Sequence, residues 1–101
     1  MDLADGHLLA LDNILNNKFK YIHLNMGTGK GTSVLELINT FQKVNKVDIR
    51  FRFCERRKGD VPFLVADNSL AKRLLNWEPK RDLNNMCEDS WNWYKSSLKT
   101  F

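Results

Sequence analysis

The segment "NMGTGKGTSVLEL", residues 25–37, constrains the fold most strongly because three glycines stand directly before a helix-start signal. Ser33 and Glu36 have the spacing of a capping box, in which each side chain satisfies a backbone N–H of the first helical turn. Residues 21–25, "YIHLN", are rich in β-formers and apolar at alternate positions. We therefore predict a strand over 21–25, a tight glycine turn and a helix from Ser33 to about Val44.

The same glycines resemble a phosphate-binding loop, but they fit neither of the two common templates. A P-loop requires Gly-Lys followed by Ser or Thr, whereas Lys30 is followed by Gly31. The dinucleotide fingerprint G-x-G-x-x-G matches Gly27 and Gly29 but has Thr32 in place of its third glycine. We favour a structural turn, and a helix N-terminus that attracts an anion stays open as the alternative.

Three further helices are predicted from apolar spacing and capping residues. The first covers residues 2–16. The second begins at residue 67 or 68, where an aspartate and an asparagine can cap it, and ends near residue 76, with Trp77 closing it onto the core. Asp82 caps the last helix, which follows Pro79.

Residues 48–54, "DIRFRFC", alternate apolar and basic side chains, which is the period-2 pattern of a strand buried on one face. The pattern places Phe51 and Phe53 in the core and the neighbouring arginines outside. A short extended stretch is expected over 63–66. Together these elements predict an α/β (α+β) fold with a small sheet and packed helices, formed by residues 1–101 as a single domain.

Composition excludes several classes of protein. A chain of 101 residues with two cysteines has too few thiols for a disulfide scaffold. The sequence has no long apolar run of the kind that predicts a membrane span or a leader peptide. We therefore expect a cytoplasmic protein. The formal charge of +4 suits nucleic acid or phosphorylated metabolites without choosing between them.

Catalytic and metal-binding sets are missing from the sequence. A tyrosine with a lysine four residues later is a common oxidoreductase pair, because the ammonium lowers the pKa of the phenol. Here Tyr21 is followed at that spacing by Asn25, and Tyr94 by Leu98. The two histidines and two cysteines show no recognised metal spacing. We predict no catalytic residue and no metal ligand.

The segment "CERRKGDVPFL", residues 54–64, carries side chains that could bind a ligand. Arg57 and Lys58 are cations beside a turn at Gly59, and Asp60 can accept hydroxyl protons. This set suits a phosphate and a ribose. A solvated basic loop explains the composition equally well, and both interpretations stay open at this point.

Five blocks of sequence carry a resemblance to a known family. They are "MDLADGH", "LNMGTGKGTSVLELI", "RRKGDVP", "ADNSLAKRLLNW" and "MCEDSWNWYK". They occur in the order found in the C-terminal part of the UDP-glucose 4-epimerases, which are extended short-chain dehydrogenases/reductases, and the likeness runs from residue 1 to about 95. The patterns M-C-x-D-x-W-x-W and R-x-G-D carry most of its specificity.

The resemblance implies a function and site residues. That family interconverts UDP-glucose and UDP-galactose by transient hydride transfer to bound NAD, and its C-terminal part binds UDP. By motif, Arg57 contacts the UDP phosphates and Asp60 the ribose. Leu64 stands at the border of the hexose pocket, where it leaves acceptance of N-acetylated sugars open. The glycine segment corresponds to a structural turn, and the NAD pyrophosphate loop lies elsewhere.

The resemblance also implies what this chain lacks. The family's Rossmann domain holds NAD and supplies a catalytic Ser and Tyr-x-x-x-Lys, and none of these is present. We therefore expect a C-terminal fragment that contributes UDP contacts, binds no NAD alone and is inactive alone. It is a truncated product, one half of a split enzyme or an excised domain. Its partner is an NAD-domain chain or a second copy, recruited by an exposed apolar face.

Two alternatives remain. A small basic nucleic-acid-binding module would use Phe51 or Phe53 for stacking and five cations on phosphates: Arg50, Arg52, Arg56, Arg57 and Lys58. The period-2 pattern weighs against it, because it sends the phenylalanines to the face opposite Arg50 and Arg52. The other alternative is a structural remnant without a ligand.

Overall fold

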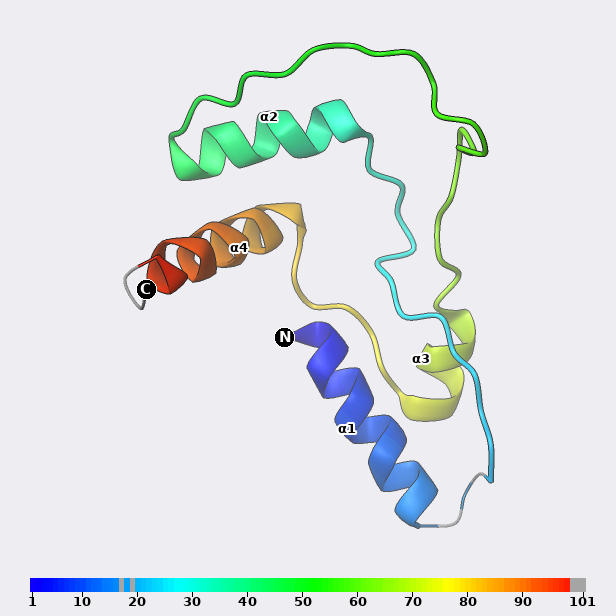
Figure 1. The fold of residues 1–101 in the computed structure, drawn as a ribbon. Coiled ribbons are helices and arrows are strands. Elements are labelled where there is room, and N and C mark those ends of the chain that lie inside the picture. The colour runs from blue at the N-terminus through cyan, green and yellow to red at the C-terminus, as the bar shows by residue number, and fades with distance from the viewer. Residues whose placement is uncertain (17, 19, 99–101) are drawn as a thin grey trace. The chain divides into compact units, whose positions relative to one another are not determined.

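The computed structural model describes residues 1–16, 18 and 20–98, and this part of the chain contains four helices (Figure 1). They are α1 (Asp2–Leu15), α2 (Val34–Asn45), α3 (Ser69–Leu75) and α4 (Leu83–Ser97). The chain divides into two compact units. The first comprises Met1–Gly31 and Phe63–Lys80, and the second comprises Thr32–Pro62 and Arg81–Phe101. The assignment of residues 1–101 to one domain stays a prediction.

Capping boxes begin α2 and α4; the sequence predicts the first as a box and, at the second, Asp82 as a cap without its partner Asn85. The Ser33 hydroxyl accepts a hydrogen bond from the Glu36 amide at 3.1 Å, and the Glu36 carboxylate accepts one from the Ser33 amide at 2.9 Å. At α4, the Asp82 carboxylate and the Asn85 side chain make the same reciprocal pair, at 3.0 and 3.2 Å. Each box satisfies two backbone donors that the first helical turn leaves free.

The predicted helices in the first unit are also confirmed. At α3 the N-cap residue is Asn68, but the side-chain bond comes from Asp67, whose carboxylate accepts from the Ser69 amide at 2.9 Å. The helix ends at Asn76 in the left-handed conformation, and the Trp77 amide then donates to the Ala71 carbonyl. This reversal turns Trp77 back onto the helix.

Trp77 anchors the core of the first unit. It is 4% exposed and clusters with the buried residues Ala71 and Leu75. Its indole N–H donates to the Asp2 carbonyl at 2.8 Å, so the buried ring has its polar atom satisfied. We call this set the tryptophan core; Ala10, Leu24 and Met26 pack against it from α1 and the following segment.

The second unit is held by contacts between α2 and α4. Cys87 is its buried residue, and the burial raises the pKa of the Cys87 thiol. The Asn45 side chain donates to the Cys87 carbonyl at 3.1 Å. Trp91 meets Phe41 edge-on at 5.8 Å between centroids and stacks on Tyr94 at 5.5 Å. Aromatic pairs of this geometry stabilise a packed interface beyond their buried area.

The predicted sheet is wrong: the described residues contain no strand, so the α/β (α+β) assignment is replaced by a helical one. Residues 21–25, 48–54 and 63–66 follow extended or irregular paths without a ladder (Figure 1). The physical reason is that a strand is completed only by backbone groups of a neighbour, and no described segment supplies them.

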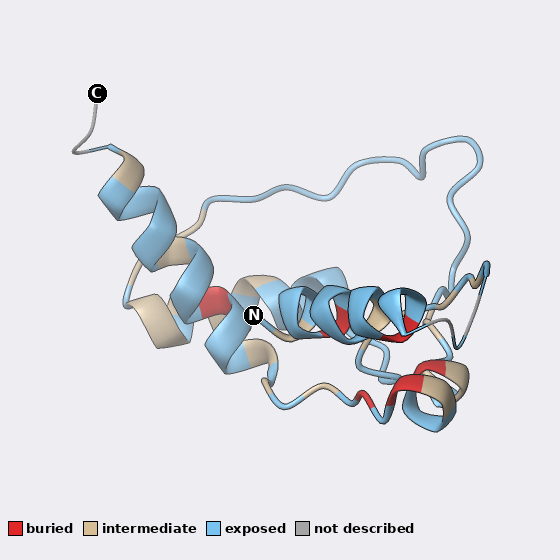
Figure 2. Cartoon of the chain, turned by 90° about the horizontal axis from the view of Figure 1, so that it is seen from below, coloured by how far each residue is buried: buried red, intermediate tan, exposed pale blue. Residues whose placement is uncertain are grey.

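Only one of these segments shows the predicted alternation of buried and exposed side chains. Ile22, Leu24 and Met26 are half-buried and the residues between them are exposed, as a one-sided strand would have them. By contrast, Phe51 is 49% and Phe53 is 81% exposed, so their predicted place in the core is wrong. Figure 2 shows how little of the chain is buried: the red segments are few, and the long connection after α2 is blue throughout most of its length.

Candidate functional site

The R-x-G-D sequence, residues 57–60, forms a tight turn in the second unit. The Asp60 amide donates to the Arg57 carbonyl at 3.2 Å, which closes the turn. Gly59 has φ of +92°, a left-handed conformation that glycine adopts without the steric cost of a side chain. The backbone therefore explains why a glycine stands between the two residues expected to bind a nucleotide.

The turn brings together the two residues that the motif predicts as UDP contacts. Arg57 Nε donates to Asp60 Oδ2 at 3.1 Å, and the two side chains are 86% and 43% exposed. The carboxylate engages Nε and the Arg57 side chain is largely exposed, which leaves the two terminal nitrogens of the guanidinium available to a ligand. Such a fork suits bidentate binding of a phosphate.

Leu64, the third predicted site residue, lies in a different unit from this turn. It belongs to the first unit and is 87% exposed, whereas Arg57 and Asp60 belong to the second. Its expected position beside a sugar pocket stays a prediction.

The glycine segment does not have the geometry of a dinucleotide cradle. A Cβ atom on Gly27 would lie 2.8 Å from the Ala66 Cβ, so the absent side chain makes room for protein atoms. The Gly27 carbonyl also accepts a hydrogen bond from the Asn68 side chain at 2.7 Å. A loop that binds pyrophosphate leaves this space to the ligand. The glycine segment therefore does not fit the pyrophosphate of a dinucleotide, and its interpretation as a structural turn is supported.

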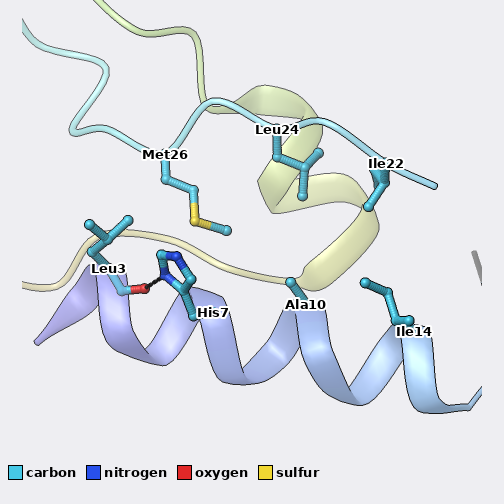
Figure 3. Close-up of a pocket in the computed structure, with 7 residues that line it drawn as sticks. All are labelled: Leu3, His7, Ala10, Ile14, Ile22, Leu24 and Met26. Carbon is cyan, nitrogen blue, oxygen red and sulfur yellow. Dashed lines mark hydrogen bonds between the residues drawn. The ribbon is translucent and has the colours of Figure 1, made fainter.

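An apolar groove in the first unit was not predicted. It has a volume of about 350 Å³ and lies between α1 and the segment after it (Figure 3). Four of its residues come from one face of α1 and three from alternate positions of that segment: Leu3, His7, Ala10, Ile14, Ile22, Leu24 and Met26. The sequence does show apolar residues at helical spacing in α1 and at alternate positions over residues 22–26. Sequence alone did not indicate that these two sets of residues meet.

The chemistry of this groove is limited. Its ring side chain, His7, donates from Nδ1 to the Leu3 carbonyl at 2.7 Å, one helical turn back (Figure 3). The other side chains that line it are apolar. A catalytic or small-molecule site normally combines apolar walls with several convergent polar groups. We therefore assign the groove no catalytic role.

The described ranges contain neither a metal-binding cluster nor a membrane-spanning helix. Residues 1–16, 18 and 20–98 contain no cluster of three or more His, Cys, Asp or Glu side chains able to hold a metal ion. None of the helices in this part of the chain has the length and apolarity needed to cross a membrane.

Comparison with known proteins gives consistent matches. Residues 1–90 match the model of the GDP-mannose 4,6 dehydratase family. UDP-glucose 4-epimerase of Bacillus subtilis is 45% identical over 101 residues, which are 100% of this chain and 30% of that protein. A bifunctional UDP-glucose 4-epimerase and UDP-xylose 4-epimerase of Arabidopsis thaliana is 42% identical over 94 residues, 92% of this chain and 27% of that protein.

A solved structure agrees with these sequence matches. UDP-glucose 4-epimerase from Bifidobacterium longum, in complex with NAD+ and UDP, is 32% identical and superimposes with a TM-score of 0.82. The match covers 99% of this chain and 29% of that one. The resemblance to UDP-glucose 4-epimerases drawn from the motifs is confirmed, as is the expectation that full-length members bind NAD. The chain spans about 30% of the length of the curated relatives it matches.

Proposed function

Because the chain belongs to the GDP-mannose 4,6 dehydratase family, we propose that its R-x-G-D turn binds the diphosphate and ribose of a UDP-sugar. The observation that carries the proposal is the Arg57–Asp60 pair, held at 3.1 Å with both side chains open to solvent. The similarity to UDP-glucose 4-epimerases, including one solved with UDP, supports the choice of nucleotide.

In this proposal the two side chains have separate tasks. The terminal nitrogens of Arg57 bind phosphate oxygens, and Asp60 Oδ2 holds the guanidinium in place through Nε. The second carboxylate oxygen of Asp60 accepts a hydrogen bond from a ribose hydroxyl. Arg56 and Lys58 are exposed beside the pair and add positive charge, which draws a diphosphate towards the turn.

This turn alone gives weak binding. The three proposed hydrogen bonds contribute about 1.5–3 kcal/mol each, but association costs about 4–15 kcal/mol in lost translational and rotational freedom. The net free energy therefore does not clearly exceed the roughly 4.1 kcal/mol that a millimolar dissociation constant requires. We therefore propose that the chain contributes UDP contacts as the C-terminal part of an epimerase and is inactive by itself. Hydride transfer to NAD then depends on protein outside these 101 residues. A cytoplasmic location is part of the proposal and is supported by two cysteines that are both free.

The nucleotide assignment is tested by titrating the ¹⁵N-labelled chain with UDP and following the amide signals. We expect shifts that centre on Arg57, Gly59 and Asp60, with a dissociation constant at or above about 1 mM. Arg57→Ala should abolish these shifts. Arg73→Ala is the matched control, because it removes the same charge from an exposed position on α3. Equal losses in both variants would reduce the effect to net charge and contradict the proposal.

The enzymatic part of the proposal is tested by complementation. The Bacillus subtilis relative is prepared without the region that this chain matches, and conversion of UDP-galactose to UDP-glucose is measured with and without the chain. We expect activity only in the mixture, reduced by Arg57→Ala. A mixture that folds and binds NAD but stays inactive at saturating chain would contradict the epimerase assignment.

A further inference from the structure

Lys58 occupies the first of the two central positions of the R-x-G-D turn. The hydrogen bond from the Asp60 amide to the Arg57 carbonyl closes this turn within four residues. The geometry of the turn is therefore set locally and does not depend on protein that is remote in sequence. Because Lys58 stands inside the closed turn, its backbone is held close to both Arg57 and Asp60.

The charge of Lys58 is uncompensated in the described part of the chain. Lys58 is exposed and makes no ion pair with a described residue, whereas Arg57 is paired with Asp60. The space beside it is open, since a Cβ atom on Gly59 would meet nothing within 4 Å. The tip of the turn thus combines a cation with room for a ligand.

The Arg57–Asp60 pair accounts for only one phosphate group of a diphosphate. Arg57 Nε is bound to Asp60 Oδ2 at 3.1 Å, which leaves the two terminal nitrogens of the guanidinium for a ligand. A guanidinium fork of this kind matches two oxygens of a single phosphate. The diphosphate of a UDP-sugar carries one negative charge on each phosphate, so its second charge needs another cation.

On the basis of the UDP-sugar function proposed above, we propose that Lys58 binds the second phosphate. Lys58 then makes the turn prefer sugars activated by a nucleoside diphosphate over compounds with a single phosphate. A lysine suits this task because its ammonium has three rotatable donors on a flexible stem. It can follow a phosphate whose position is already fixed by Arg57.

Arg56 is the other cation close to the turn, and the course of the chain disfavours it. The chain approaches the turn from residues 49–54, which we call the alternating segment, along an extended path (Figure 1). Successive side chains of an extended backbone project to opposite sides. Arg56 is therefore directed away from the side on which Arg57 meets its ligand.

The test compares UDP-glucose with UMP in titrations of the whole ¹⁵N-labelled chain. At about pH 8, above the second pKa of a phosphate monoester, both ligands carry the same charge, spread over two phosphates in one and confined to one phosphate in the other. Lys58→Ala should raise the dissociation constant of UDP-glucose about fivefold and that of UMP less than about twofold. Lys58→Arg keeps the cation and should retain most of the preference. Equal weakening of both ligands by Lys58→Ala would reduce the residue to net charge and overturn the proposal.

Arg56→Ala is the matched control, because it removes the same charge from an exposed residue just outside the turn. We expect it to change both affinities by the same small factor. A selective loss of UDP-glucose binding in Arg56→Ala would assign the second phosphate to Arg56 and overturn the proposal. Failure here is distinct from failure of the proposed function. If UDP-glucose shifts the amide signals of the turn and Lys58→Ala has no effect, only the role of Lys58 is lost; if the unmodified chain shows no shifts, both are lost.

Discussion

The tryptophan core of the first unit and the alternating segment of the second satisfy their polar groups in different ways. In the core, the indole N–H of Trp77 finds the Asp2 carbonyl, 75 positions away in sequence, and the ring is almost fully buried. In the alternating segment, residues 49–54, the aromatic rings are exposed and the backbone amides after Ile49 have no partner among the described residues. The difference shows which part of the fold this chain completes with its own residues.

Trp77→Ala should give the largest effect on the first unit. It removes the largest buried side chain of the tryptophan core together with its hydrogen bond to the Asp2 carbonyl, so we expect a loss of about 3–5 kcal/mol in the free energy of unfolding. Urea unfolding followed by amide signals of α1 and α3 measures it. Trp93→Ala is the control: that ring is 72% exposed, and its loss should change stability by about 0.5 kcal/mol or less. Similar losses in both variants would remove the distinction between the two regions.

Gly27→Ala should give the next largest effect. The added Cβ would lie 2.8 Å from the Ala66 Cβ, and neither atom can rotate away, so the backbone must move. Overpacking of this kind costs about 1–3 kcal/mol. Gly59→Ala is a useful contrast, because its Cβ would meet nothing within 4 Å and only the positive φ is strained. Urea unfolding should show a destabilised first unit for Gly27→Ala alone.

Ser33→Ala should have a smaller effect, restricted to the second unit. It removes the side-chain acceptor of the Glu36 amide and should cost about 1 kcal/mol. Faster amide exchange in the first turn of α2 is the measurement. Thr32→Ala changes the neighbouring exposed residue, which has no capping bond, and should leave the exchange rates as they are. If both substitutions had the same effect, the capping box would not be what starts the helix.

The smallest expected effect depends on pH. Hydrogen bonds from Ser33, first from its backbone amide, lower the pKa of the Glu36 carboxyl. A pKa lowered by folding adds stability above the unfolded pKa, and this stability is lost as the pH falls through the folded pKa. We expect the first turn of α2 to loosen in that acidic window, seen as faster amide exchange. Glu36→Gln keeps an acceptor without the titration, so its exchange should show no such acid step.

Local patterns predicted the helices and the turn at the candidate site. The boxes at Ser33 and Asp82 act within four residues, and Arg57 and Asp60 are three apart, so sequence spacing alone brings each set together. The prediction of a sheet was wrong because a sheet is completed by the backbone of a neighbouring strand, which no local sequence pattern can supply. Phe51 and Phe53 have the period of buried residues, but a period indicates which side chains share a face and does not provide the surface that covers them.

Residue-resolved amide hydrogen exchange of the unmodified chain tests this account most directly. The account predicts slow exchange in the hydrogen-bonded turns of α1–α4 and at the Trp77 indole, with residues 50–58 exchanging at the rate of an unstructured peptide. Slow exchange across residues 50–58 in the chain by itself would contradict it, because those amides would then have a strand partner that the chain already supplies.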